Sequence, residues 1–201
     1  IISGSRRNPA ENEFANTLGQ IVGRDLSFKY DAGHADLLDG AQNALADQFG
    51  GQVFADFTFG THAMEVAVDV DTGKVNVLKI IACYDVGKAI NPLSAEGQLE
   101  GGALYGLGYG MIEEVMLDKG NTLTPSLAEY LIPTAVDAPD VKTIMIESGG
   151  GVGPFGAKGL GEPACVSVAA AFANAVADAI GGRIYDLPVT AEKIIRALGK
   201  I

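Results

Sequence analysis

The segment HAMEVAVDVDTGKVNVLKIIA, residues 62–82, carries the pattern that decides the fold. In its first half every second residue is apolar: Met64, Val66, Val68 and Val70. This alternation is typical of a strand with one buried face. The triplet DTG at residues 71–73 supplies turn residues, and a second alternating run starts at Val75. The segment therefore predicts an antiparallel hairpin with strands on both sides of this turn.

A glycine-rich helix is expected next, within residues 85–117. Pro92 ends the preceding structure, Ser94 is the expected N-cap, and Glu96 is expected in the first turn, where the helix dipole favours an acid. The helix contains six glycines, at positions 97, 101, 102, 106, 108 and 110. Each costs about 1 kcal/mol of helix stability relative to alanine. Their number predicts close approach of another backbone or a ligand.

The remaining elements follow from local signals. A turn is expected at DKGN, residues 118–121, and a strand over residues 141–147. A helix is expected over residues 164–180, ended by Gly181 and Gly182, and a last helix starts from Thr190 as N-cap. A further helix is expected over residues 37–49. The fold class is α+β, a mixed sheet or hairpin with packed helices, in a domain of residues 59–201. A poorly assigned segment, 1–58, precedes it and is expected to form an interface.

Composition excludes several function classes. The 201 residues carry 14 basic and 25 acidic side chains, a net charge of -11, with no basic stripe. This balance argues against nucleic acid and anionic membrane surfaces as partners. Cys83 and Cys165 stand far apart, so neither a disulfide framework nor a zinc or iron–sulfur site is expected. No apolar run of membrane-span length is expected either, and these features indicate a cytoplasmic protein.

The loop GVGPFGAKGLGEP, residues 151–163, is the main candidate for a site. Gly151, Gly153 and Gly156 fit G-x-G-x-x-G, but Pro154 interrupts the turn and the following helix starts too late for a dinucleotide fold. A P-loop is excluded because no Ser or Thr follows Lys158. A glycine-rich turn before a helix can still hold an anionic or strongly polar ligand. From the residues alone, Glu162 is either part of that site or an acid at a helix start.

Three separated motifs give the chain a family resemblance. FGAKGLGEPA, residues 155–164, followed by VAAAFANAVADAIGGRIYDLPVTAEKI, resembles the C-terminal part of the molybdopterin-binding subunit of the molybdenum hydroxylases, the xanthine dehydrogenase and aldehyde oxidase family. The segment around EGQLEGGALYGLGYGMIEE, residues 96–114, is similar to the preceding part of the same subunit. The motifs occur in the family's order, and the resemblance covers residues 59–198.

The resemblance implies roles for particular residues. Glu162 takes the position of the family's general base beside the molybdenum. Gln98, with Gly97 before it, takes the position of the glutamine that contacts the pterin. The backbone turn that approaches the cofactor is formed by Gly156, Ala157, Lys158, Gly159, Leu160 and Gly161. No metal ligand is expected from this chain, because the pterin dithiolene holds the molybdenum.

The resemblance also implies partners. The family's Gly-Gly-x-Phe-Gly loop has only a weak counterpart at residues 50–54, and Tyr105 stands where many members carry glutamine. The sequence also shows neither the cysteine clusters of iron–sulfur modules nor a flavin domain. We therefore expect a second molybdopterin-binding subunit, an iron–sulfur subunit and an FAD subunit as partners. The cofactor is expected to be molybdenum with molybdopterin, in its mononucleotide or cytosine dinucleotide form.

The implied reaction is hydroxylation of an N-heteroaromatic ring carbon or an aldehyde, a small-molecule substrate, with water as the oxygen source. A carbon monoxide dehydrogenase of the same family and a non-catalytic assembly subunit are the alternatives.

Three other side chains have simpler interpretations. His62 is expected to be structural or near an interface, because one histidine rarely makes a metal site. Cys83 and Cys165 are expected to be small buried apolar residues. For Lys158, two roles stay open: it neutralises part of the cofactor phosphate, or it ties down its own loop.

Overall fold

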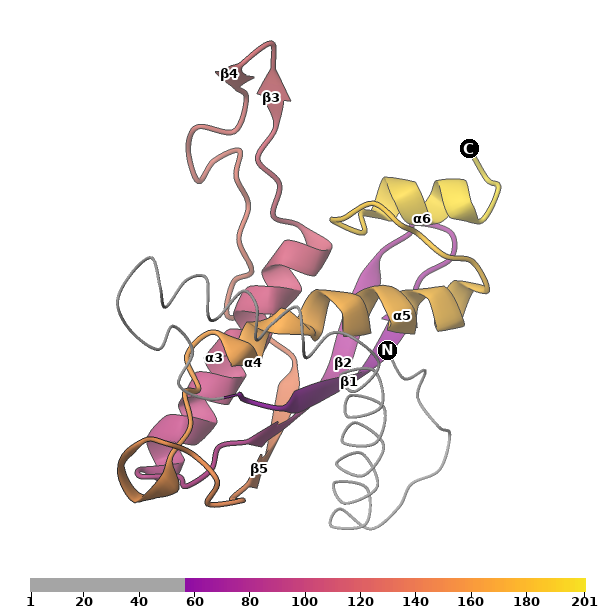
Figure 1. Cartoon of the computed structure of the whole chain (residues 1–201). Coiled ribbons are helices and arrows are strands. Elements are labelled where there is room, and N and C mark those ends of the chain that lie inside the picture. Colours follow the sequence, from indigo (N-terminus) through magenta and orange to yellow (C-terminus); the bar gives the residue numbers. More distant parts are fainter. Residues whose placement is uncertain (1–56) are drawn as a thin grey trace, which may run out of the picture.

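The computed structural model describes residues 57–201, and the predicted helix at residues 37–49 lies outside them. Three strands form one sheet in the order β1-β2-β5: β1 (Gly60–Val68), β2 (Val75–Asp85) and β5 (Asp140–Ile146). The predicted hairpin is confirmed, since β1 and β2 pair antiparallel. β5 lies parallel to β2, so the chain between them must cross back over the sheet. This mixed sheet with its helices confirms the α+β class (Figure 1).

The connection between the hairpin strands is two residues longer than the alternation indicates. β1 ends at Val68, so Val70 lies in the turn and is exposed. The Asp69 carboxylate accepts hydrogen bonds from the backbone N–H groups of Asp71 (2.9 Å) and Thr72 (3.2 Å). Such local bonds favour a turn over a continuing strand. Gly73 completes the turn with φ 73°, a conformation that glycine adopts without strain.

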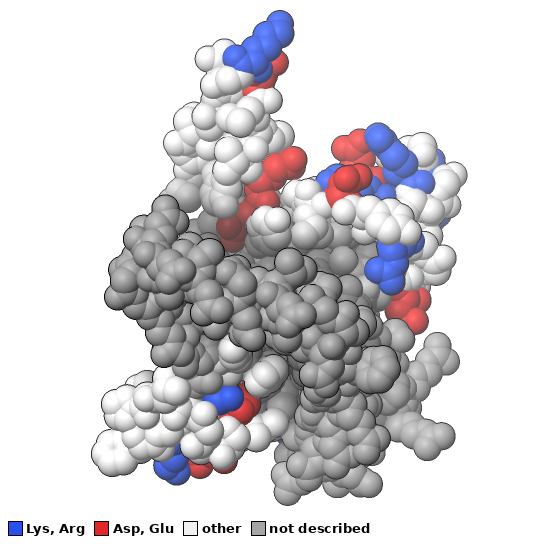
Figure 2. Space-filling model, viewed as in Figure 1, with Lys and Arg blue, Asp and Glu red and all other residues white. Residues whose placement is uncertain are grey.

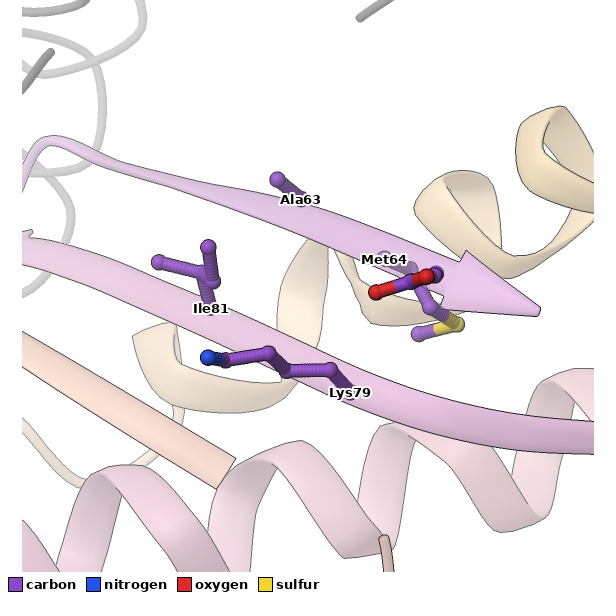
Figure 3. Close-up of a pocket in the computed structure, with 5 residues that line it drawn as sticks. Ala63, Met64, Lys79 and Ile81 are labelled. Atoms are coloured by element: carbon purple, nitrogen blue, oxygen red, sulfur yellow. The ribbon is translucent and has the colours of Figure 1, made fainter. Parts of the chain in front are cut away.

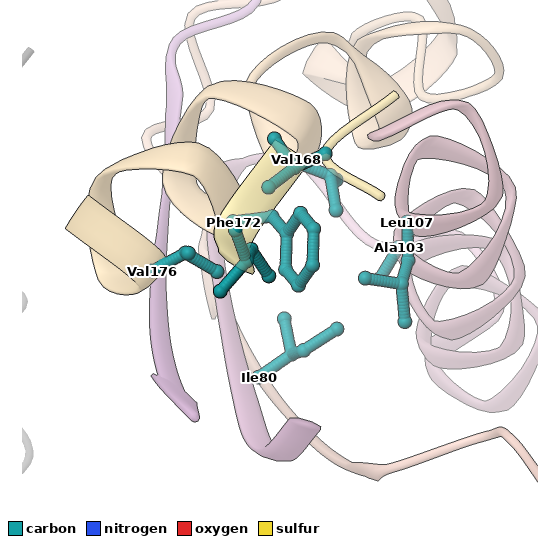
Figure 4. Close-up of a cluster of buried hydrophobic side chains, with 8 residues drawn as sticks. Ile80, Ala103, Leu107, Val168, Phe172 and Val176 are labelled. Carbon is teal, nitrogen blue, oxygen red and sulfur yellow. The ribbon is translucent and has the colours of Figure 1, made fainter. Parts of the chain in front are cut away.

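Two long helices cover the sheet and enclose the core. α3 (Pro92–Met111) packs against β5, α5 (Val168–Ile180) packs against β1, and the two helices contact each other. Figure 4 shows Phe172 and Val176 of α5 facing Ile80 of β2 and Leu107 of α3. All four side chains are almost completely buried. Burial of each contributes about 1.5–3 kcal/mol relative to exposure, which makes this cluster the main stabilising unit of the described part.

The start of α3 corrects the prediction for its cap. Asn91 is the N-cap, and its side-chain oxygen accepts a hydrogen bond from the backbone N–H of Ser94 at 3.1 Å. Pro92 occupies the first helical position, where its fixed φ suits the helix and its missing N–H costs nothing. Ser94 is therefore inside the helix, and Glu96 lies beyond the first turn, which holds no acid.

The α3 glycines fall into two groups, apart from Gly108, where a side chain would collide with Glu113 and Pro133 of the segment that follows the helix. A side chain at Gly102 or Gly106 would collide with Ala164 or with the carbonyl of Cys165, and one at Gly110 would meet Ala169. These three positions lie four residues apart on one face, so they let α3 lie close to α4 (Pro163–Val166) and α5. At Gly97 and Gly101 no described atom lies within 4 Å of an added Cβ. The predicted close backbone approach is thus confirmed for one face of the helix.

The apolar stretch after residue 162 forms two helices instead of the single predicted one. α4 and α5 are separated at Ser167, where φ is -97° and ψ is 0°. Residues Pro163–Ile180 have a mean hydropathy of 1.5 over 18 residues, so a segment with the length and composition of a membrane span does exist here, contrary to expectation. Its large side chains Val168, Phe172 and Val176 belong to the core described above.

The connection between α3 and β5 includes a protruding segment, residues 113–136, which we call the arm. Its tip is a two-stranded hairpin, β3 (Leu117–Asp118) and β4 (Asn121–Thr122). The turn predicted at DKGN is confirmed, with positive φ at Lys119 and Gly120. At its base the Tyr130 hydroxyl donates to the Glu113 carboxylate at 2.6 Å. Figure 1 shows the arm standing away from the sheet and helices.

The C-terminal elements follow the predicted signals. α5 ends at Gly181, which has the expected left-handed conformation. The last helix, α6 (Ala191–Ala197), has Thr190 as N-cap, whose hydroxyl accepts from the Lys193 N–H. The one-turn 3-10 helix η2 (Pro154–Gly156) lies in the glycine-rich loop.

Candidate functional site

Glu162 ends the glycine-rich loop and occupies the N-cap position of α4. Its side chain is exposed and makes no capping hydrogen bond within the described part of the chain. Its backbone carbonyl accepts hydrogen bonds from the N–H and the Sγ of Cys165, both at 3.1 Å. The backbone of Glu162 is thus held by the helix, while its exposed carboxylate caps no backbone N–H. Both interpretations of Glu162, part of a site or an acid favoured by the helix dipole, stay predictions.

Gln98 lies beside the same loop although it comes from a different element. It projects from α3, and its Nε2 donates a hydrogen bond to the Gly161 carbonyl at 3.2 Å. The preceding Gly97 is exposed and leaves open space on this side of the helix. Two motifs that are separated in the sequence therefore meet in the structure, next to Glu162.

The loop glycines serve two purposes. Gly151 donates to the Gly156 carbonyl at 3.1 Å, and Gly153 donates to the Ala157 carbonyl at 3.0 Å. Gly156 has φ 83°, and a side chain on it would collide with the Gly149 carbonyl. These three glycines are needed by the loop's own folding. Gly159 and Gly161 have no described atom within 4 Å of an added Cβ, so within the described part the backbone is uncovered on that side. Their carbonyls do have partners, since Gly159 accepts from the Thr58 hydroxyl at 2.8 Å and Gly161 accepts from Gln98.

A buried ion pair holds the loop to the sheet. The Lys158 ammonium lies 2.9 Å from the Asp85 carboxylate, and their side chains are only 7% and 14% exposed. Lys158 Nζ also donates to the Phe57 carbonyl at 3.0 Å and lies 5.3 Å from the centre of the Phe59 ring. These contacts support the loop-tying role for Lys158. Binding of a cofactor phosphate by its ammonium stays a prediction.

Asp85 joins three loops through the same carboxylate. It accepts hydrogen bonds from the Gly87 N–H at 3.0 Å and the Ser148 hydroxyl at 2.9 Å in addition to the lysine. Partial burial raises the pKa of Asp85, but the hydrogen bonds from Lys158, Gly87 and Ser148 outweigh it, so the pKa is lowered overall. The carboxylate therefore stays ionised and keeps the loops after β2 and β5 next to the glycine-rich loop.

Sequence reasoning missed a polar cluster below α4. His62 Nδ1 lies 2.8 Å from Ser167 Oγ, and the Tyr84 hydroxyl donates to the Pro163 carbonyl at 2.7 Å. Burial lowers the pKa of His62 to about 4, so the imidazole is neutral near pH 7. The prediction of a structural histidine is consistent with this. A signal was present, because His62 has the same inward parity as Met64 and Val66 in the alternating strand.

Other features of the surface do not form the site. A shallow pocket between β1 and β2 is lined by Ala63, Met64, Glu65, Lys79 and Ile81 (Figure 3). None of the predicted site residues lines it. In residues 57–201 no three His, Cys, Asp or Glu side chains form a group that could hold a metal ion. Basic and acidic side chains are interspersed over the described part of the face seen in Figure 2.

Comparison with known proteins shows which family the chain matches. Residues 11–139 match the model of the molybdopterin cofactor-binding domain, a range that includes part of the unassigned N-terminal segment. The nicotine 6-hydroxylase large subunit of Paenarthrobacter nicotinovorans is 40% identical over 145 residues, which are 70% of this chain and 18% of that protein.

Two solved structures have the same fold. Quinoline 2-oxidoreductase from Pseudomonas putida 86 matches with a TM-score of 0.64 and 37% identity, over 70% of this chain and 18% of that one. Reconstituted CO dehydrogenase from Oligotropha carboxidovorans matches with a TM-score of 0.63 and 33% identity, over 71% and 18%. The chain thus spans about a fifth of the length of the proteins it matches. With most of its length matched at this identity, the chain belongs to the molybdopterin cofactor-binding domain family of the molybdenum hydroxylases.

Proposed function

We propose that this chain supplies the general base and part of the pterin contacts in the active site of a molybdenum hydroxylase. The observation that carries the proposal is the hydrogen bond from Gln98 Nε2 to the Gly161 carbonyl. It places the glutamine motif of α3 beside the segment that ends in Glu162, although these motifs are far apart in the sequence. The reaction is hydroxylation of an N-heteroaromatic ring carbon or an aldehyde with oxygen from water.

The residues present fit a molybdopterin cofactor. No described atom lies within 4 Å of an added Cβ at Gly159, Gly161 or Gly97, and the Gln98 amide of α3 contacts the loop at the Gly161 carbonyl. A flat, polar group needs this combination of close backbone approach and a fixed amide. When bound, the cofactor supplies the molybdenum centre that takes up electrons from the substrate. Among these residues, Gln98 and the backbone of residues 156–161 would hold it.

Glu162 is positioned for proton transfer in such a site. Its carboxylate is exposed next to the open backbone, so it can accept a proton from the water-derived oxygen nucleophile. A general base contributes about 10²–10⁴-fold to a rate when it lies within hydrogen-bond reach. It also works best when water is excluded and its pKa is raised. We infer that the enclosure comes from a second molybdopterin-binding subunit, which corresponds to the part of the relatives that this chain does not match.

Exposed apolar side chains in the described part support the presence of such a covering partner. The arm exposes Val115, Leu117, Leu127 and Val136, and Figure 2 shows most of the arm without charged side chains. Leu93, Tyr105 and Tyr109 are exposed along α3, on the side of the open glycines. Large exposed apolar surfaces are typical of interaction sites. Their occupant is the remaining molybdopterin-binding polypeptide, and iron–sulfur and FAD subunits complete the route for electrons.

Elemental analysis combined with native mass spectrometry of the purified assembly tests this function. We expect molybdenum in stoichiometric amount, together with a molybdopterin-binding partner. A stable 201-residue monomer without a molybdenum-containing partner would contradict the proposal. The likeness to CO dehydrogenase makes carbon monoxide oxidation the second candidate, and copper beside molybdenum in the same analysis would favour it.

A further inference from the structure

The short helix α4 is tied to the sheet at both of its ends. At the start, the Tyr84 hydroxyl of β2 donates to the carbonyl of Pro163, the residue directly after Glu162. At the end, His62 Nδ1 of β1 lies 2.8 Å from the hydroxyl of Ser167. The two anchoring rings touch edge to face, with centroids 5.4 Å apart. A four-residue helix has little stability of its own, so its position depends on tertiary contacts such as these.

The hydrogen bonds of Tyr84 determine which nitrogen of His62 carries the hydrogen. Tyr84 has one hydroxyl hydrogen, which the Pro163 carbonyl takes at 2.7 Å. Its oxygen therefore acts as an acceptor toward His62 Nδ1, 3.4 Å away. A hydrogen on Nδ1 serves both the Tyr84 and the Ser167 oxygens, whereas Nε2 is buried and has no hydrogen-bond partner among the described residues. We assign the Nδ1–H tautomer on this basis.

Glycines allow close packing around the Tyr84 ring and around α4. A side chain at Gly60 would occupy the space of the Tyr84 ring. On the opposite side, Gly102 and Gly106 of α3 let that helix press against Ala164 and the Cys165 carbonyl. α4 is thus held between the polar cluster and α3. Because proline fixes its own φ, the orientation of Pro163 also fixes the peptide that joins it to Glu162.

We propose that Tyr84 and His62 are positioning residues that set the direction of the Glu162 carboxylate. The inference rests on the proposed function of Glu162, and neither side chain contacts substrate or cofactor in it. Loss of either hydrogen bond lets α4 shift relative to the sheet. A displacement of about 1 Å at a reacting group can cost about 10²-fold in rate. Tyr84→Phe and His62→Leu are therefore expected to lower kcat by about 10- to 100-fold, with KM changed by less than about twofold.

The variants are compared in the assembled enzyme. Tyr84→Phe retains the ring that packs beside Gly60 and removes only the hydroxyl. His62→Asn serves as the rescue variant, because its amide can donate to Ser167 from the position of Nδ1, and it should retain kcat within about threefold of the unsubstituted enzyme. Tyr185→Phe removes the hydroxyl of an exposed tyrosine and should change nothing. Molybdenum content should equal that of the unsubstituted enzyme in all four variants.

Hydrogen–deuterium exchange of a peptide covering residues 159–168 gives a readout independent of turnover. We expect faster exchange at residues 164–168 in Tyr84→Phe and His62→Leu, and unchanged exchange in His62→Asn and Tyr185→Phe. Unchanged kcat in Tyr84→Phe and His62→Leu overturns the proposal, whether or not exchange increases. So does His62→Asn behaving as His62→Leu. If Glu162→Gln leaves turnover intact, the proposed function fails instead, and exchange still reports whether the two residues hold α4.

Discussion

His62 shows how one residue in an alternating strand can depart from the apolar pattern and still face inward. Its neighbours of the same parity, Met64 and Val66, pack against the core, and His62 continues their row toward α4. An imidazole tolerates this place because it is neutral near pH 7 and Ser167 shares a hydrogen bond with it. The same burial makes the residue sensitive to acid.

We predict that His62 destabilises the fold in mild acid. Burial lowers the pKa of the imidazole from 6.5 in the unfolded chain to about 4 in the folded protein. Between these values the unfolded chain binds the proton and the folded protein does not, so the free energy of unfolding falls as the pH falls. The loss between pH 7 and pH 4 is about 3 kcal/mol, at ~1.4 kcal/mol per pKa unit.

Urea unfolding of the enzyme and of His62→Gln at both pH values measures this effect. Between pH 7 and pH 4 the free energy of unfolding of His62→Gln should fall by about 3 kcal/mol less than that of the unsubstituted protein. Carboxylates such as Asp85 titrate equally in both proteins and do not contribute to this difference. Equal losses in the two proteins would show that the buried imidazole does not titrate in this way.

The second residue-scale prediction concerns the Asp85–Lys158 pair. Lys158→Met leaves the Asp85 carboxylate mostly buried without its cation, which costs about 3–5 kcal/mol in the free energy of unfolding. Lys88→Met is the matched control, because the Lys88–Glu147 pair lies nearby but its side chains are 51% and 41% exposed. An exposed pair contributes about 0–1 kcal/mol. Similar losses for both variants, measured by chemical unfolding, would contradict the anchoring role of Lys158.

At the scale of elements, α3 provides a direct test of why its glycines are there. Gly101→Ala places a methyl group in open space and should stabilise the helix by about 1 kcal/mol. Gly102→Ala makes the identical change one residue further, where the methyl group would collide with Ala164 of α4. Overpacking of this kind costs about 1–3 kcal/mol. Thermal unfolding of the two variants should therefore shift in opposite directions, and parallel shifts would mean that α3 and α4 do not pack this closely.

The elements that the sequence predicts well are those with local signals. The hairpin follows from alternation and the DTG turn, and α6 follows from Thr190 as cap. The cap of α3 was missed because Asn91 and Ser94 are equally good capping residues and Pro92 decides between them. The break at Ser167 was missed because the apolar pattern continues across it, and only packing of α4 against α3 and the sheet produces it.

The candidate site divides in the same way. The motif around Glu162 and the glutamine at position 98 are visible in the sequence, but their meeting at the Gly161 carbonyl depends on how α3 lies against the loop. The pairing of Lys158 with Asp85 and of Tyr84 with Pro163 joins segments that no local pattern connects. Such contacts arise from tertiary structure. The sequence alone therefore does not decide between the two roles of Lys158, and it predicts no role for Tyr84.

At the scale of the whole molecule, the arm is the feature that calls for a partner. Leu127 and Val136 are 70% and 94% exposed on it. Leu127→Lys should weaken the proposed assembly with a second molybdopterin-binding subunit, because burying an unpaired charge at an interface is costly. Val70→Lys, at the exposed hairpin turn, is the control. Native mass spectrometry should show a lower fraction of complex for Leu127→Lys only, and intact assembly in both would exclude the arm from the interface.

Turnover of the Glu162→Gln variant in the assembled, molybdenum-loaded enzyme tests the central claim most directly. Glutamine keeps the size of the side chain and removes its ability to accept the proton, so molybdenum content should be unchanged. We predict that kcat falls by about 10²–10⁴-fold, the contribution of a general base. Glu192→Gln, an exposed acid on α6, should leave kcat unchanged. A Glu162→Gln enzyme that turns over at the rate of the unsubstituted enzyme would contradict the catalytic role and leave the chain as an assembly subunit.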